Sequence, residues 1–294
     1  LFFIYAVKIL TQSVLVFFRN NFSHKLFTRV SAKILSKYLH KNYIFHVVTN
    51  SATLIRNTGS EASLFCNAVV ASVLKIVSDT IVFIFISALL FSFDPKITIF
   101  AIMFLSLIGF LFYISISEKV KKWGKLRQHH ASQVVKQMQQ TFSSIREVII
   151  FGAQKFFINN YNQQNIEFSK STRNRDTMNQ LPRGVLEFLG AMTFVFLIFY
   201  LMSSNVIMSD IIVTVGVYAA ATVRLLPLIS NLISSCVLLK FNMPVVDKIY
   251  DELQLENDLI YDIDKKISFI DKIQLKKVSY IYPGIKSPAL EEID

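Results

Sequence analysis

Five long apolar runs constrain the fold of this chain more than any other feature. They occupy residues 1–20, 69–93, 97–117, 184–205 and 208–239. Each is long enough to cross the hydrocarbon core of a bilayer, which takes about 20 mostly apolar residues in a helix. With 53% hydrophobic residues and 27 Phe among 294 positions, the chain also departs from the composition of water-soluble proteins. The sequence therefore predicts an all-α membrane protein that crosses a lipid bilayer five times.

The distribution of Lys and Arg predicts which ends of these helices face the cytoplasm. Residues 19–56 hold seven basic residues and no acid, and residues 118–183 hold twelve basic residues and four acids, whereas residues 188–210 hold no basic residue. Because basic residues are retained on the cytoplasmic side, both basic segments and the C-terminus are expected there. This sidedness accounts for the net charge of +11, so nucleic acid is not an expected partner.

The two cytoplasmic segments have helical periodicity, and each is interrupted once. Apolar residues recur every four positions from Phe22 to Tyr38, so the membrane helices are expected to continue into the cytoplasm. Residues 50–65 are rich in Asn, Thr, Gly and Ser, and residues 142–161 contain Gly152 between two apolar clusters. We expect either short helices across the far ends of two hairpins or ordinary turns at these places. On the outer side, Asp94 and Pro95 suit a cap and a first helical residue.

The composition changes after residue 243. Residues 244–272 mix acidic and basic residues without a long apolar run, and they are predicted to be a helix end and a linker. Residues 273–294 begin with β-branched and aromatic residues and reach Pro283-Gly284. This pattern is typical of a strand followed by a turn, and no partner strand is expected here.

The last 22 residues, IQLKKVSYIYPGIKSPALEEID, resemble the start of the nucleotide-binding domain of ATP-binding cassette exporters. The rest of the chain is similar to helices two to six of the six-helix type IV exporter bundle of that family, with long cytoplasmic extensions. The resemblance implies that Tyr282 stacks on the adenine of ATP, which is bound with Mg²⁺ by the rest of that domain. It also implies coupling helices that contact the nucleotide-binding domain through regions 41–60 and 142–161. A second half-transporter is implied as the partner of this chain, as in a homodimer.

Three segments, NSATLIRN, LPRGVLEFLG and VRLLPLISNL, are similar to bacterial flippases of lipid-linked oligosaccharides. This resemblance implies ATP-driven translocation of an amphipathic substrate across the inner (plasma) membrane by a multi-pass protein. A peptide or lipid exporter and a non-transporting membrane scaffold are the alternatives.

No residues of the hydrolytic machinery are expected in this chain. The GxxxxGK[ST] phosphate loop does not follow the predicted strand, so ATP hydrolysis is expected of a longer parent protein of which this is a fragment. No other hydrolase motif suggests a catalytic residue. Cys66 and Cys236 lie far apart without a nearby His pair, so no metal site is predicted.

Three ionisable residues near the last two apolar runs are the candidate substrate contacts. Arg224 lies within the last run, where a charge is costly unless it faces a cavity or a partner. It either contacts an anionic head group such as a pyrophosphate or pairs with an acid on a neighbouring helix. Arg183 and Glu187 are four residues apart, so they form a pair on one helix face or act as a substrate gate. Lys75 and Asp79 repeat this spacing and are interpreted as a structural pair.

Overall fold

The computed structural model describes residues 2–93, 95–203, 208–256, 258, 272, 274–282 and 287–294. It divides into two compact units, residues 1–258 and 259–294, each of which is described by itself. Asp94, Pro283 and Gly284, to which the sequence assigned turn and capping roles, lie outside the described residues.

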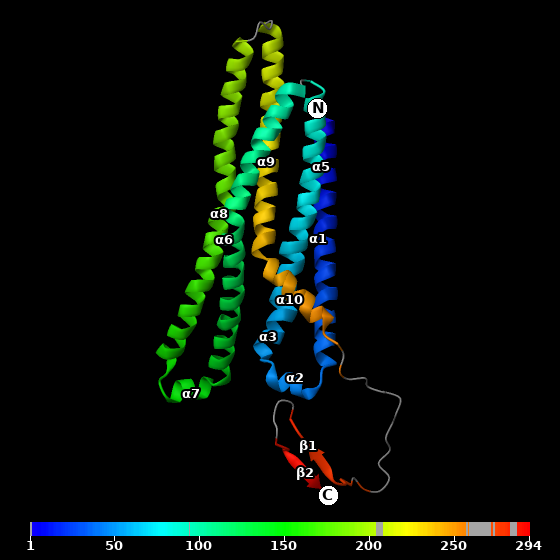
Figure 1. Ribbon diagram of the computed structural model, residues 1–294, viewed down its shortest axis with the longest axis vertical. Helices are drawn as coiled ribbons and strands as arrows, with labels where there is room; N and C mark the ends of the chain where they lie inside the picture. Colours follow the sequence, from blue (N-terminus) through cyan, green and yellow to red (C-terminus); the bar gives the residue numbers. More distant parts are fainter. Residues whose placement is uncertain are drawn as a thin grey trace. The chain divides into compact units, whose positions relative to one another are not determined.

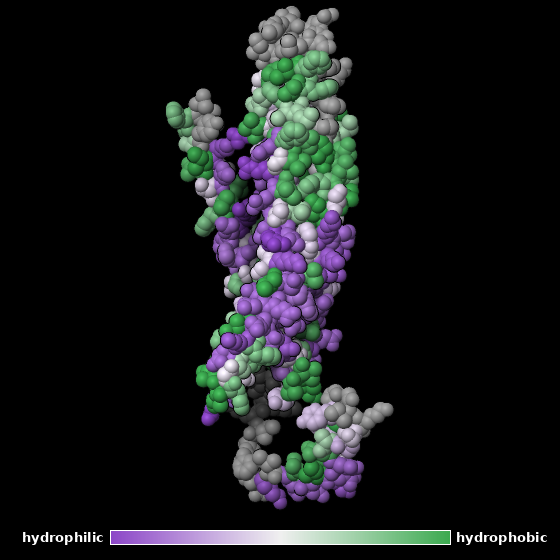
Figure 2. All heavy atoms as spheres, turned by 90° about the vertical axis from the view of Figure 1, so that its left-hand side faces the viewer, coloured by the Kyte–Doolittle hydropathy of each residue, from purple (hydrophilic) through white to green (hydrophobic). Residues whose placement is uncertain are grey.

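Long helices build the first unit, and the apolar runs fall on them (Figure 1). These helices are α1 (Phe2–Leu39), α5 (Ala71–Phe91), α6 (Pro95–Ser143), α8 (Gln154–Ser203) and α9 (Met208–Phe241). With 49 residues, α6 is about 74 Å long and exceeds the thickness of a bilayer with its head groups. Along the helices of the face drawn in Figure 2, hydrophobic residues gather at the upper part, hydrophilic residues lie below them, and a smaller hydrophobic group lies at the lower end.

Among the described residues, two helical segments are long and apolar enough to cross a membrane, Ser51–Phe91 and Val215–Phe241. The other three predicted crossings, near 1–20, 97–117 and 184–205, stay predictions. The described residues of these ranges nevertheless lie on α1, α6 and α8, in each case at one end of a helix whose remainder is more polar.

Close packing joins α9 to α6 and α8. One apolar cluster lies where α9 meets α6 and α8, and contains Val120, Leu186, Ile229, Ile233, Val237 and Phe241. Here Gly124 of α6 approaches the backbone of α9 so closely that an added Cβ would collide with the carbonyl oxygen of Phe241. A Cβ on Gly190 of α8 would lie 2.6 Å from Leu226 Cδ1 of α9. Small residues therefore permit the α6–α9 and α8–α9 contacts.

The first helix pair is joined by a short transverse helix, which lies before the interruption expected at residues 50–65 but within region 41–60. Helix α1 ends at Leu39, and α2 (Tyr43–Val48) follows, capped by Asn42, whose Oδ1 accepts a hydrogen bond from the Phe45 amide at 3.0 Å. Figure 1 shows α2 crossing the end of this pair. Asn50 then caps the next helix through its Oδ1, which accepts from the Ala52 amide at 2.8 Å.

The expected break at residues 50–65 is wrong, because the chain is helical from Ser51 to Phe91. The elements are α3 (Ser51–Arg56), the π-helix η1 (Asn57–Glu61), α4 (Ala62–Leu64), the π-helix η2 (Phe65–Val70) and α5. The wider π turns keep Gly59 and its polar neighbours within the helix instead of ending it.

The second helix pair has its transverse helix where the sequence indicated a break. Helix α7 (Ile145–Ile150) lies between α6 and α8 and crosses their ends in Figure 1. Gly152 has a φ of +64°, a left-handed conformation that a glycine adopts at little cost. This residue lets the chain reverse into α8.

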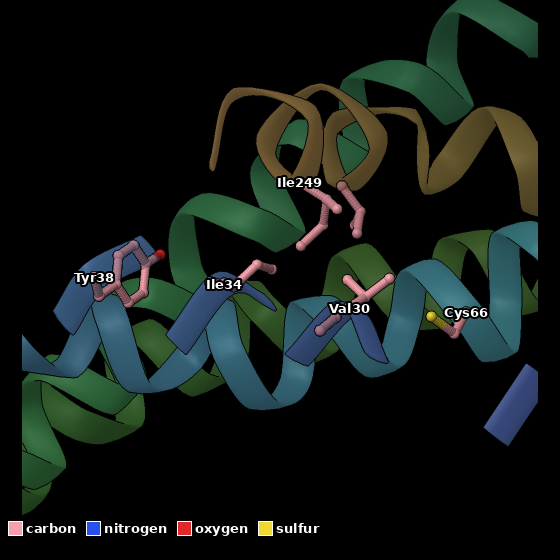
Figure 3. Close-up of a cluster of buried hydrophobic side chains, with 7 residues drawn as sticks. Val30, Ile34, Tyr38, Cys66 and Ile249 are labelled. Carbon is pink, nitrogen blue, oxygen red and sulfur yellow. The ribbon is translucent and has the colours of Figure 1, made fainter. Parts of the chain in front are cut away.

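The predicted linker at 244–272 begins instead with a packed helix, α10 (Met243–Gln254). Its apolar residues recur every four positions, and Val245 and Ile249 are buried against α1 and η2 in a cluster that includes Val30, Ile34, Tyr38 and Cys66 (Figure 3). The charged residues between these apolar positions made the segment read as a linker, but Asp247 and Asp251 lie on the exposed face of an amphipathic helix, and Glu252 is buried with the apolar residues.

The second unit is a β-hairpin. Strand β1 (Val278–Tyr280) pairs antiparallel with β2 (Leu290–Ile293), with Val278 opposite Ile293 and Tyr280 opposite Leu290. The expectation of a strand without a partner is therefore wrong. The short run at Leu290–Ile293 contains two Glu, and it was not recognised as a strand.

Candidate functional site

Two of the three predicted substrate contacts lie together between α8 and α9. Arg183 Nε donates a hydrogen bond to Glu187 Oε1 at 2.8 Å, as their spacing predicted. Both residues line a hollow of about 360 Å³, whose other lining residues are Val223, Leu226, Pro227, Ser230 and Asn231. Arg224 is exposed and does not line this hollow, and it forms no ion pair with another described residue.

A proline and a hydrogen bond between helices lie beside this hollow. Pro182 is buried inside α8 and cannot donate the backbone hydrogen bond of a regular helix. Ser234 Oγ of α9 donates a hydrogen bond to the Asn179 carbonyl of α8 at 3.0 Å. This contact links the two helices next to the proline.

The interpretation of Lys75 and Asp79 as a pair is wrong in its geometry. Lys75 Nζ donates to Asn231 Oδ1 of α9 at 3.4 Å, and no ion pair between Lys75 and Asp79 occurs in this described part of α5. Since Asn231 also lines the hollow, Lys75 is linked through it to the site of Arg183 and Glu187.

A buried ionic cluster lies nearer to the transverse helices, and sequence reasoning missed it. Glu61 of η1, with a side chain only 1% exposed, accepts a hydrogen bond from Arg56 Nη1 at 2.8 Å and lies 3.7 Å from Arg127 Nη2 of α6. Both arginines are buried as well. Arg56 and Glu61 lie five positions apart in a segment that was expected to be a break, and Arg127 is distant in the sequence. The one available signal was that Glu61 is the first acid in the chain.

A second polar cluster joins α1, η1 and α10. Asn57 Nδ2 donates hydrogen bonds to Glu252 Oε1 at 2.9 Å and to the Tyr38 hydroxyl at 3.2 Å. Lys248 Nζ lies 2.7 Å from the same Glu252 oxygen. Burial raises the pKa of the Tyr38 hydroxyl, an effect that the hydrogen bond from Asn57 opposes. Tyr38 is therefore neutral at physiological pH and accepts a hydrogen bond from Asn57.

The junction of α9 and α10 is held by α6 and α8. The guanidinium carbons of Arg127 and Arg175 lie 5.7 and 5.0 Å from the centre of the Phe241 ring, within the range of a cation–π contact. Gln128 Nε2 donates to the Pro244 carbonyl at 3.2 Å. Burial lowers the pKa of Arg127, and the charge of Glu61 opposes this shift. These contacts position the helix that precedes the second unit in the sequence.

The transverse helices present apolar side chains to the surroundings. On α2 these are Tyr43, Val47 and Val48, and at α7 they are Ile149, Ile150 and Phe151. Exposed apolar groups at the polar ends of both helix pairs are typical of contact surfaces for a partner.

Tyr282 lies in the second unit and is 51% exposed. Its ring centroid is 5.0 Å from that of Tyr280, with an angle of 81° between the ring planes, so the two side chains lie on one side of the hairpin as their alternation predicted. Among the described residues, no group of three or more His, Cys, Asp or Glu could hold a metal ion.

Residues 1–230 match the family model of the ABC transporter transmembrane region. The chain belongs to this family. As the transmembrane domain of an ABC transporter, it is a membrane protein that serves transport, and its helical fold is that of the ABC membrane domain. ABC transporters in general associate with the bilayer and with a nucleotide-binding domain, through which they use ATP and Mg²⁺. The ABC transmembrane region thus accounts for the apolar ends of the long helices and for their polar extensions.

Proposed function

We propose that the chain forms the transmembrane half of an ATP-driven exporter that flips an amphipathic, anionic substrate such as a lipid-linked oligosaccharide. The hollow between α8 and α9 is the observation that carries this proposal. It places a guanidinium beside apolar side chains and Pro227, within α8 and α9, at the point where the apolar run of α8 begins. An amphipathic lipid with an anionic head group has the matching chemistry.

The Arg183–Glu187 pair acts as the gate of this hollow. The planar guanidinium can donate two parallel hydrogen bonds to a phosphate, and Glu187 occupies one of its donors in the structure. An arriving phosphate group displaces Glu187 and takes its place on Arg183. We assign a second contact with the head group to Arg224, which follows the lining residue Val223 and lies nearer to the N-terminus of α9 than Pro227.

Energy for this cycle comes from ATP bound outside the transmembrane bundle. The exposed apolar faces of α2 and α7, within regions 41–60 and 142–161, are assigned to contacts with the nucleotide-binding domain. Tyr282 is assigned to the adenine of ATP because its ring is exposed on the hairpin. A second half-transporter completes the dimer, in the inner (plasma) membrane, with the transverse helices and the C-terminus in the cytoplasm.

The test is ATP-dependent flipping of a fluorescent lipid-linked pyrophosphate glycan in proteoliposomes that contain the chain with its nucleotide-binding domain. Arg183→Ala is expected to lower the flipping rate at least tenfold, because one bidentate contact to a phosphate is lost. Lys170→Ala is the matched control, since Lys170 is also on α8 and pairs with Glu167 at 3.5 Å away from the hollow. Equal flipping by wild type and Arg183→Ala would contradict the proposal, as would flipping of a peptide cargo alone.

A further inference from the structure

Helix α1 changes from apolar to basic along one exposed face. Phe18 and Phe22 are exposed, and Lys25 and Arg29 continue the same face at intervals of three and four residues. No Asp or Glu occurs among the first 60 residues of the chain, so nothing on this helix neutralises the two charges. We refer to Phe18, Phe22, Lys25 and Arg29 as the α1 face.

Several basic residues of α8 are paired with acids, whereas those of the α1 face are not. On α8, Lys170 lies 3.5 Å from Glu167, Arg175 lies 3.1 Å from Asp176, and Arg183 lies 2.8 Å from Glu187. Neither Lys25 nor Arg29 has an acidic partner within 4.0 Å in the described part of the chain. Their charges are therefore available to an anion from outside the chain.

The direction of α1 brings these side chains toward the bilayer. The helix runs from its apolar end to its polar end, and side chains on an α-helix lean toward the N-terminus of the helix. Lys25 lies seven residues beyond Phe18, or about 10 Å along the axis, and its long stem reaches back toward the apolar part. The head-group layer is about 5–8 Å thick on each side of the hydrocarbon core, so the charged ends reach it.

We propose that Lys25 and Arg29 bind the head groups of anionic phospholipids in the inner leaflet, while Phe18 and Phe22 contact the acyl chains. This inference rests on the orientation given under the proposed function. The phosphodiester of the lipid accepts hydrogen bonds from the Arg29 guanidinium and the Lys25 ammonium. Each basic residue near an anionic surface strengthens binding about fivefold, so the two together contribute about 25-fold.

The test is a lipid titration of the detergent-solubilised protein, with phosphatidylglycerol and phosphatidylcholine as probes and native mass spectrometry as the readout. Lys25→Gln/Arg29→Gln is expected to weaken binding of the first phosphatidylglycerol about 25-fold and to leave phosphatidylcholine binding unchanged. The matched control is Lys33→Gln/Lys37→Gln, which removes the same charge from the same helix about 12 Å farther from the bilayer. This control is expected to retain at least half of the preference.

Three outcomes would overturn the inference. The first is equal loss of phosphatidylglycerol binding in both double variants, which would indicate a diffuse charge effect. The second is an unchanged preference in Lys25→Gln/Arg29→Gln. The third is cross-linking of Lys25→Cys to a second copy of the chain in membranes, which would assign the α1 face to a protein interface.

A separate labelling experiment distinguishes a failure of the lipid site from a failure of the orientation. Ser36 is exposed on the polar part of α1. Reaction of Ser36→Cys with an impermeant maleimide in intact cells would reject the orientation. If Ser36→Cys reacts only after permeabilisation and phosphatidylglycerol preference is absent, the lipid inference alone is rejected.

Discussion

Replacing Glu61 by Gln is expected to destabilise the bundle more than replacing the acidic residue of any other ion pair described above. Glu61 is the counter-ion of Arg56 at 2.8 Å and of Arg127 at 3.7 Å, and the side chains of the two arginines are only 7% and 8% exposed. Removing one partner of a buried ion pair costs about 3–5 kcal/mol, because the remaining charge stays buried without compensation. Gln has nearly the same volume, so the change isolates the charge from the effect of a cavity.

Thermal unfolding in detergent micelles measures this loss, and the chain offers a convenient probe. Its single Trp, Trp123, packs against the apolar cluster that contains Phe241. At about 2 °C per kcal/mol for a chain of this size, the midpoint followed by Trp fluorescence is expected to fall by about 6–10 °C.

Glu187→Gln is the matched control for this measurement. It also removes an acid from an Arg–Glu pair at 2.8 Å, but the Arg183 and Glu187 side chains are 76% and 57% exposed. An exposed ion pair contributes little to stability, so the midpoint should fall by no more than about 2 °C. Equal shifts of the midpoint in the two variants would refute the reasoning that burial determines how much the Glu61 ion pairs stabilise the bundle.

Three further outcomes are expected. Gly124→Ala should lower the unfolding midpoint, because its Cβ collides with the Phe241 carbonyl, whereas Gly184→Ala, with nothing within 4 Å of the new Cβ, should leave the midpoint unchanged or raise it. The hydrogen bond from Lys41 lowers the pKa of the Asp258 carboxyl, so its contribution to stability is present at pH 7 and decreases as the pH falls below about 4; a stability difference between wild type and Asp258→Asn that does not decrease as the pH is lowered below 4 would contradict this. With the nucleotide-binding domain present, Tyr282→Ala should weaken ATP binding measured by calorimetry by about 1–3 kcal/mol, and Tyr282→Phe should not.

Local patterns predicted much of the helical architecture. Apolar runs placed the long helices, and the spacing of four residues between Arg183 and Glu187 predicted their hydrogen bond. These features depend on residues close together in the sequence, for which helix geometry fixes the distance. The left-handed Gly152 was likewise visible as a helix end.

Contacts between distant segments could not be predicted in this way. Asn57 and Glu252 are joined by a hydrogen bond although they are 195 positions apart, and Arg127 meets Glu61 because α6 packs beside α3, the helix that precedes η1. Helix α10 was taken for a linker because its buried face is recognised only when the parts of α1 and η2 that it packs against are known. The π turns kept Gly59 in a helix where polar composition indicated a break.

Labelling of single cysteines tests the orientation of the bundle most directly. In a chain with Cys66 and Cys236 replaced by Ala, Ser92→Cys lies beyond the end of α5 and Ser169→Cys lies on the polar part of α8, and both positions are exposed. An impermeant maleimide is expected to label Ser92→Cys in intact cells and to label Ser169→Cys only after the membrane is permeabilised. Labelling of Ser169→Cys in intact cells would place the transverse helix α7 outside the cell, out of reach of a cytoplasmic nucleotide-binding domain, and would contradict ATP-driven transport by this bundle.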